Sequence, residues 1–399
     1  MKRLCRKIAP VMVVIAATVP AAACGAARQQ IPPGTDRGAL IVRLGPDTLF
    51  VERFELTPGR MYVESVVRAP AAAFRTIDAK LNPDGTLSSI AVATFDPASP
   101  RAGIARDSAT VTFSADSTIY SLGLGAAKQF LRLPDRADVV ISLPGNLWFP
   151  NYVLLALRAP RVVGDSIVGT MSMRLGAYPL VVKRVARDTV TLWSQISGVM
   201  RVILGPDGRL AALDGTGSSL GYVGTRIDWI DIDSVSRAFA ARERAAGVVG
   251  SLSGRDTVLA ELAGARLTID YGRPTKRGRT IFGNVVPWNT VWRTGANLAT
   301  HFTTSRDLQF GAAVVPAGTY TLHTIPSPDS WTLLVSRQTG QWGSSAVDPA
   351  MVIARIPMRV RESSEVVETF TIALVPEGGG GRIRLAWDRT LAEAGFTIR

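Results

Sequence analysis

The residues best suited to bind a ligand are concentrated in one segment, 270–297, which reads DYGRPTKRGRTIFGNVVPWNTVWRTGAN. Its cationic groups could converge on an anion, its aromatic rings could stack on a sugar or another ring, and its asparagines offer amide donors and acceptors. The same composition also fits a structured loop whose arginines cap backbone carbonyls, and the sequence leaves both interpretations open. The predicted ligand-binding residues are Tyr271, Arg273, Lys276, Arg279, Trp292, Arg293 and Asn297.

Catalysis has fewer candidates. In an enzyme, Arg279 and Arg293 would orient a polar or anionic substrate, and Asp270 would act as general base. The sequence contains no Gly-x-Ser-x-Gly elbow, phosphate-binding loop or dinucleotide fingerprint. We therefore predict no catalytic residue and no cofactor. A cleft that gathers these arginines beside a carboxylate would favour an enzyme, whereas arginines held by backbone carbonyls would oppose it.

Two histidines occur in the chain, His301 and His323, each within a strand-like run. Alternation places His301 on the face opposite Leu298 and Phe302. Neither histidine has the spacing of a metal site and no cysteine accompanies them, so no metal is predicted. Each is expected to be a partly exposed histidine of a sheet.

The formal net charge is +13, and 39 arginines outnumber six lysines. A nucleic-acid-binding protein usually concentrates its basic residues on one face or in blocks. Here the arginines are spread along the whole chain, and the densest cluster is RPTKRGR at 273–279. Nucleic acid is therefore not an expected partner.

Residues 1–23 have the pattern of an export signal. The basic start MKRLCRK is followed by the apolar run IAPVMVVIAATVPAAA, which contains two prolines. This run is shorter than the roughly 20 apolar residues that a spanning helix needs. The sequence AAAC that ends at Cys24 resembles a bacterial lipobox, so Cys24 is predicted to be lipidated and to anchor the protein to a membrane of the cell envelope, facing the periplasm or cell surface. Cleavage after an Ala-x-Ala pattern, leaving a secreted protein, stays the alternative.

The rest of the chain predicts an all-β protein of two domains. Short β-branched and aromatic runs alternate with Pro-Asp-Gly turns, which is typical of antiparallel sheets. Residues 151–159 fit a short helix or a buried strand, and Gly247 would end a helix after 233. The predicted organisation is a tether at 24–38, an N-terminal curved sheet or half-barrel with a short helix at 39–232, a helical connector at 233–250 and an antiparallel β-sandwich at 251–399.

Four motifs in the C-terminal part carry a family resemblance: YGRPTKRGRTIFGNVVPWNTVWRTGAN, AGTYTLHTIP, WTLLVSRQTGQWG and LAWDRT. They resemble the bacterial domain of unknown function 2911 family over about 257–399. The resemblance implies a β-sandwich module of exported, often lipid-anchored bacterial proteins, and it implies no established reaction. Two features depart from the family, since His323 stands where a large aromatic residue is expected and the ending LAEAGFTIR is less regular.

These observations predict a lipid-anchored envelope protein that binds a lipid, a glycan or an envelope partner without catalysis. The N-terminal half also looks like the curved half-barrels of periplasmic lipid-carrier proteins. The alternative is a hydrolase-like or carbohydrate-active enzyme with its site in the 271–297 loop.

Overall fold

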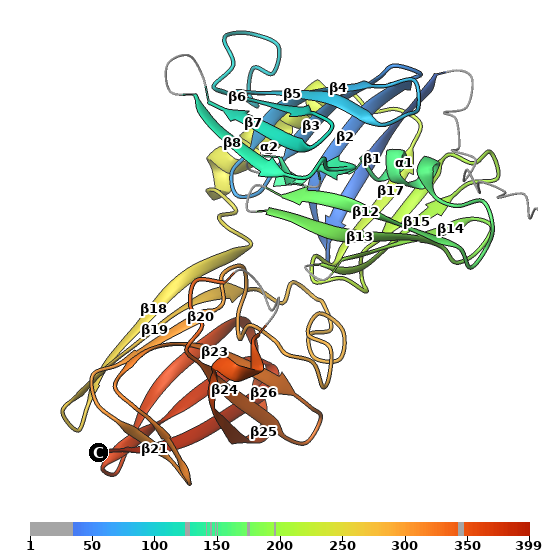
Figure 1. Ribbon diagram of the computed structural model, residues 1–399. Helices are drawn as coiled ribbons and strands as arrows, with labels where there is room; N and C mark the ends of the chain where they lie inside the picture. Colours follow the sequence, from blue (N-terminus) through green and yellow to red (C-terminus); the bar gives the residue numbers. More distant parts are fainter. Residues whose placement is uncertain are drawn as a thin grey trace, which may run out of the picture.

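The computed structural model describes residues 35–399 apart from 124–127, 141, 144–145, 148, 150, 174–175, 195–196 and 342–346. The predicted signal peptide, Cys24 and the tether up to residue 34 lie outside the described residues. Figure 1 shows two β-rich lobes, one formed by the N-terminal half of the chain and one by the C-terminal part. Among the helices of the described residues, none is long and apolar enough to span a membrane.

The N-terminal lobe is built on one sheet of 15 strands in the order β8-β7-β6-β5-β4-β3-β2-β1-β17-β16-β15-β14-β13-β12-β9. Neighbouring strands are antiparallel except β9, which pairs in parallel with β12. A further small pair, β10 and β11, stands apart from this sheet. The strands are β1 (Asp36–Leu44), β2 (Asp47–Thr57), β3 (Arg60–Val67), β4 (Ala73–Leu81), β5 (Leu87–Phe95), β6 (Asp107–Phe113), β7 (Ser117–Leu122), β8 (Gln129–Pro134), β9 (Val139–Val140), β10 (Ser142–Leu143), β11 (Asn146–Leu147), β12 (Ser166–Met173), β13 (Gly176–Arg184), β14 (Thr189–Ser194), β15 (Gly198–Leu204), β16 (Leu210–Asp214) and β17 (Tyr222–Ile227).

This sheet curls around the helix α1 (Asn151–Arg158). Seven of the eight helix residues are buried, and they join the aromatic side chains of the concave face in one hydrophobic core. The two ends of the sheet come together without pairing: the hydroxyls of Tyr120 on β7 and Ser172 on β12 are 2.5 Å apart. The predicted curved sheet with a short helix is confirmed, and the run at 151–159 is a helix.

A second helix, α2 (Ile232–Ala246), covers the outside of the same sheet. Its Asp231 N-cap accepts a hydrogen bond from the Ser234 amide, and Gly247 ends it with φ of 79°. Ile232 and Phe239 pack with Val51 on β2 and with neighbouring side chains of β3 and β4. Strand β2 is therefore covered on both faces, by the core that includes α1 on the inside and by α2 on the outside.

The C-terminal lobe is one nine-stranded antiparallel sheet in the order β18-β19-β20-β23-β24-β25-β26-β21-β22. Its strands are β18 (Ser253–Leu262), β19 (Ala265–Pro274), β20 (Thr300–Thr304), β21 (Leu308–Phe310), β22 (Ala313–Val315), β23 (Gly318–Pro326), β24 (Trp331–Ser336), β25 (Val352–Glu377) and β26 (Gly380–Ile398). A short 3-10 turn, η2 (Pro349–Met351), precedes β25.

The long hairpin of β25 and β26 gives this lobe its second layer. The first part of β25 pairs with β24, and register shifts after Glu362 let the later part cross over toward β19. There the Ile372 amide donates to the Tyr271 hydroxyl at 3.1 Å. Apolar side chains from both layers, among them Phe302 and Trp387, form one core. The predicted all-β architecture of two antiparallel units is confirmed.

Candidate functional site

The predicted basic residues of the 273–279 loop are held by groups of the fold. Arg273 lies 3.0 Å from the Asp256 carboxylate, and it also donates to the Phe370 carbonyl and the Thr371 hydroxyl at 3.4 Å each. The Lys276 ammonium lies 2.5 Å from Asp388. Both cations therefore join the two layers of the C-terminal lobe to each other.

Arg279 is directed at backbone oxygens. Its guanidinium donates to the carbonyls of Thr275 and Lys276 in its own loop, and to the Ser219 carbonyl of the N-terminal lobe at 3.5 Å. Burial is the main cause that lowers its pKa. This residue stabilises a loop that touches the other lobe.

Tyr271 and Trp292 lie in the hydrophobic core with 1% and 7% of their surface exposed. The Trp292 ring stacks on Trp387 and meets Phe370 edge to face, and its indole nitrogen donates to the Gly295 carbonyl at 3.1 Å. The faces of these rings are covered by protein side chains.

Arg293 and Asn297 are placed apart from the others. The exposed Asn297 has φ of 64° and donates to the Ser253 carbonyl at 3.4 Å. Arg293 is largely buried, and this burial lowers its pKa to about 10. The described structure does not gather the seven predicted residues in one cleft, and ligand binding by them remains a prediction. Asp270, the general base of the enzyme alternative, is paired with Arg255 at 2.8 Å.

The histidines differ from each other. His301 is half-buried, and its Nε2 accepts a hydrogen bond from the Gly340 amide at 3.1 Å. His323 was expected to be partly exposed, and this is wrong because its side chain has 0% exposure. Its strand β23 is central in the sheet, and side chains cover both of its faces. Within the part of the chain that is described, no group of three metal-binding side chains occurs.

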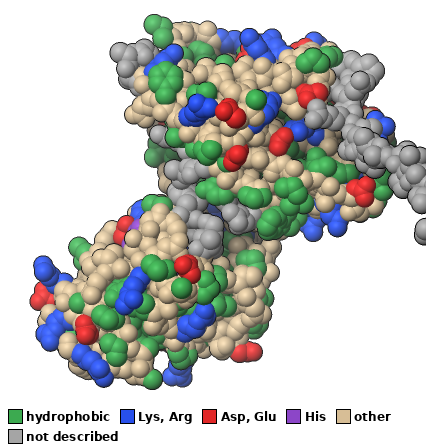
Figure 2. Space-filling view, viewed as in Figure 1, with side chains coloured by type: hydrophobic (Ala, Val, Ile, Leu, Met, Phe, Trp, Pro, Cys, Tyr) green, Lys and Arg blue, Asp and Glu red, His purple; other side chains and the backbone are tan. Residues whose placement is uncertain are grey.

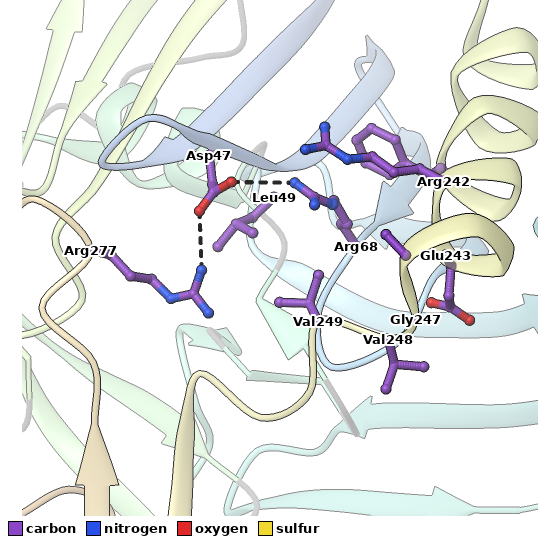
Figure 3. Close-up of a pocket in the computed structure, with 11 residues that line it drawn as sticks. Asp47, Leu49, Arg68, Arg242, Glu243, Gly247, Val248, Val249 and Arg277 are labelled. Carbon is purple, nitrogen blue, oxygen red and sulfur yellow. Dashed lines mark hydrogen bonds and ion pairs between the residues drawn. The ribbon is translucent and has the colours of Figure 1, made fainter. Parts of the chain in front are cut away.

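A pocket of about 210 Å³ lies between α2, the start of β2 and the 273–279 loop. We call it the junction pocket, and Figure 3 shows how its side chains are arranged. Its lining residues are Asp47, Leu49, Arg68, Phe239, Arg242, Glu243, Ala246, Gly247, Val248, Val249 and Arg277.

The charges of the junction pocket come from both lobes. One oxygen of the Asp47 carboxylate lies 3.4 Å from Arg68, and the other lies 3.1 Å from Arg277 of the C-terminal lobe (Figure 3). The Glu243 carboxylate accepts a hydrogen bond from the Ala72 amide. Arg242 projects from the exposed side of α2. The lining thus includes three guanidiniums and two carboxylates, and both carboxylates already have partners.

The lining of the junction pocket also includes apolar side chains. Leu49 is fully buried beneath it, while Phe239 and Val249 are partly exposed along its wall. Val248, in the linker between the lobes, is 62% exposed. The pocket therefore combines charged groups, most of them cationic, with hydrocarbon side chains, and an amphiphilic ligand needs both kinds of contact.

Comparison with known proteins applies to the C-terminal lobe. Residues 253–396 match the family described as "Protein of unknown function (DUF2911)". The resemblance predicted from the four motifs is thereby confirmed, and we call this lobe the DUF2911 domain. No curated protein matches the chain. Among solved structures, a double mutant of the vaccine antigen Transferrin Binding Protein B from Haemophilus parasuis Hp5 is 9% identical, with 93% of this chain and 76% of that chain covered and a TM-score of 0.13. That score is too low to transfer any property.

The junction pocket depends on two local features of the sequence. Gly45 has φ of 58°, and a Cβ there would meet the Arg277 carbonyl of the DUF2911 domain at 2.0 Å, so only glycine allows this approach. On the other side, the Gly250 amide donates to the Pro70 carbonyl at 2.8 Å and ties the linker to the N-terminal lobe.

Sequence reasoning missed most of the pocket residues. The sequence pattern places Asp47 in an ordinary turn and Arg242 on the polar face of a helix. The one usable signal was the density of basic residues at 273–279, which includes Arg277. In the view of Figure 2, basic side chains are otherwise scattered over both lobes among acidic ones.

Proposed function

We propose that this protein is an exported, lipid-anchored envelope protein of bacteria, and that its junction pocket binds an amphiphile with an anionic group. Support for export and anchoring comes from the sequence of residues 1–24. Support for the ligand class comes from the pocket.

The observation that carries the ligand proposal is the placement of three guanidiniums beside apolar side chains where the two lobes meet. A guanidinium binds a carboxylate or phosphate through two parallel hydrogen bonds. Arg242 is the cation that can turn toward such a group, because Arg68 and Arg277 share the Asp47 carboxylate.

The apolar wall supplies the second half of the recognition. Each methylene that a ligand buries against Leu49, Phe239 or Val249 contributes roughly 0.8 kcal/mol. The pocket holds the volume of about seven water molecules, so it fits a head group with a short length of chain.

The binding test uses the whole chain without its leader and two probes of equal chain length, decanoate and decyltrimethylammonium. We expect decanoate to bind in isothermal titration calorimetry and the cation not to bind. Arg242→Gln should weaken decanoate at least tenfold, since one charge-assisted contact is lost. Arg244→Gln is the matched control, because Arg244 is exposed on the same helix and does not line the pocket. Equal affinity for both probes would overturn the proposal.

Anchoring is tested independently of the pocket. The intact mass of the full chain isolated from bacterial membranes should show acyl chains on Cys24. Cys24→Ser should move the protein from the membrane fraction to the soluble fraction. A free thiol at Cys24 in membrane-isolated protein would overturn the anchor, and it would leave the pocket proposal standing.

A further inference from the structure

The DUF2911 sheet ends at a long strand that has a neighbour on one side only. Among the described strands, β18 pairs with β19 alone and stands at the edge of the nine-stranded sheet, on the outer side of the lobe (Figure 1). Its residues from Ser253 to Leu262 pair with β19 in one continuous register without a bulge. The strand at the other edge, β22, has only three residues. The longer free edge of this sheet is therefore β18.

The edge of β18 lacks the features that keep other strands away. Natural sheets protect a free edge with lysine, proline, a bulge or a short strand, because an unprotected edge pairs with another chain. The strand has the sequence SGRDTVLAEL, which contains neither lysine nor proline. Its Leu259 side chain is 73% exposed. This edge is therefore suited to accept a further strand.

The backbone groups on the free edge belong to alternate residues. The Thr257 amide donates to the carboxylate of its own neighbour Asp256 at 2.8 Å, and the Ser253 carbonyl accepts from the Asn297 side chain at 3.4 Å. In an antiparallel ladder, successive residues alternate between bonding to one neighbour and facing away from it. The odd-numbered residues of β18 therefore direct their amides and carbonyls away from β19. Besides Ser253 and Thr257, these residues are Arg255, Leu259 and Glu261.

The same residues project their side chains from one face of the sheet. They alternate with Val258 and Ala260, which pack against the hydrophobic core, so their own side chains lie on the outer face. Arg255 and Glu261 are both exposed there. A basic and an acidic side chain thus lie on the same edge and the same face, at equal distances in sequence from Val258.

This spacing makes the edge complementary to a second copy of itself. When two copies of β18 pair antiparallel about a two-fold axis at Val258, Arg255 faces Glu261 of the second copy, and Thr257 faces Leu259. Each facing pair joins two residues whose backbone groups point to the edge, so each pair exchanges two hydrogen bonds. Opposite charges that face each other across two strands add to the stability of the pair.

Arg255 has donors for this contact in addition to the one it already makes. Its Nε and Nη2 donate to Asp270 on β19 at 3.0 and 2.8 Å. A guanidinium donates from each of its nitrogens, so Nη1 is available for the carboxylate of the second copy. The Arg255 side chain is 33% exposed, and a partner reaches it from the solvent.

The direction of pairing also separates the N-terminal lobes. Strand β18 begins at Ser253, directly after the linker that follows α2. In an antiparallel pair the two linkers lie at opposite ends of the strands, and the two N-terminal lobes lie there with them. Pairing through β18 therefore brings the DUF2911 domains together without bringing the N-terminal lobes together.

We propose that this protein forms a two-fold homodimer in which the β18 strands of two copies pair antiparallel about Val258. The two DUF2911 sheets then continue into each other. A single strand pair buries less area than the standard interface of about 1,600 Å², so we expect a dimer that dissociates on dilution. The dimer depends neither on the junction pocket nor on the lipid anchor, and its failure would leave both standing.

The test is sedimentation velocity over a range of protein concentrations. It uses the whole chain from residue 25, which lacks Cys24 and so cannot form a disulfide-linked dimer. We expect a reversible shift from monomer to dimer as the concentration rises. Arg355→Glu is the control, because Arg355 is exposed on β25 of the same sheet and lies away from the edge. A wild-type chain that stays monomeric overturns the proposal.

Two charge reversals test the pairing register. Arg255→Glu and Glu261→Arg each place like charges opposite each other at both ends of the strand pair, so each variant should dimerise at least about tenfold more weakly than the wild type. An equimolar mixture of the two variants restores opposite charges at both contacts, and it should regain the dimer. Recovery in the mixture also shows that both variants are folded. A dimer that either reversal leaves intact, or a mixture that stays monomeric, overturns the proposal.

A proline variant tests the backbone contact separately from the charges. The Thr257 amide lies at the free edge, so Thr257→Pro removes no hydrogen bond to β19 but prevents pairing with a second strand. This variant should dimerise at least about tenfold more weakly, with its circular dichroism spectrum unchanged. A folded Thr257→Pro protein that dimerises like the wild type would show that the contact does not use this edge, and it would overturn the proposal.

Discussion

Asp47 of the N-terminal lobe and Arg277 of the DUF2911 domain form an ion pair across the domain junction, with Oδ2 and Nη1 separated by 3.1 Å. The other carboxylate oxygen of Asp47 lies 3.4 Å from Arg68 in its own lobe. The Arg277 and Asp47 side chains are 18% and 34% exposed, so water screens their attraction only in part. One carboxylate therefore holds together two guanidiniums that would otherwise repel each other.

Replacing this carboxylate should loosen the two lobes. We expect Asp47→Asn to lower the free energy of unfolding by about 1 kcal/mol, because the pair is partly exposed. The larger effect should be faster limited proteolysis in the linker at 247–252. Glu55→Gln is the control, since it breaks an exposed pair with Arg37 that lies within one lobe. Unchanged linker protection in Asp47→Asn would show that this pair does not hold the lobes.

Much of the fold could be predicted because local patterns determine it. The strand alternation and the turn residues specify antiparallel neighbours, and Gly247 ends α2 as predicted. The helix begins earlier than predicted, because Asp231 and not a residue at 233 or 234 is its N-cap. The sequence does not predict which elements cover the two faces of β2. Apolar residues on both faces show that the strand is buried, but they do not identify what packs against it. The 26-residue β25 was also missed, since exposed polar residues around 361–369 interrupt its apolar pattern.

The site was less predictable than the fold for a physical reason. Asp47 and Arg277 are 230 residues apart in the chain, and nothing local to either residue indicates the other. Residue types in segment 270–297 indicated special roles, but their partners belong to other strands.

Replacing Trp292 tests whether its ring stabilises the hydrophobic core or stacks on a ligand. Its ring is packed against Trp387 and Phe370, so Trp292→Ala should cost about 3–5 kcal/mol of unfolding free energy, measured by urea denaturation of the DUF2911 transition. Trp193→Ala is the comparison, because Trp193 is 44% exposed and should cost less than about 1 kcal/mol. A folded, stable Trp292→Ala protein with weakened ligand binding would favour the stacking role instead.

Gly45 should tolerate no side chain. Gly45→Ala would place its Cβ 2.0 Å from the Arg277 carbonyl in a backbone conformation that costs an alanine about 1–2 kcal/mol. We expect a lower melting temperature together with loss of linker protection. Gly59→Ala serves as control, since Gly59 also lies in a turn and no atom of the described residues comes within 4 Å of the position that its Cβ would take. Equal melting temperatures for the two variants would contradict the close approach of the lobes.

Because of Glu52, the stability of the N-terminal lobe should depend on pH. Its fully buried carboxyl accepts hydrogen bonds of 2.8 Å from the Phe149 amide and the Ser65 hydroxyl. Burial dominates over these bonds and raises the pKa of Glu52 from 4.5 to about 7. The folded state therefore holds its proton more tightly than the unfolded chain does. Stability is greatest below pH 4.5 for this group, and about 3 kcal/mol is lost as the pH rises through 7.

The variant Glu52→Gln isolates this contribution. A glutamine amide can accept from the Phe149 amide and donate to the Ser65 oxygen, so the hydrogen bonds are kept while the titration is removed. Urea unfolding at pH 5 and pH 8 should show the wild-type lobe losing stability relative to Glu52→Gln as the pH rises. Other titrating groups are common to both proteins and cancel in this difference. A difference that stays constant with pH would mean that Glu52 is already ionised in the folded lobe at pH 5, and that its hydrogen bonds outweigh its burial.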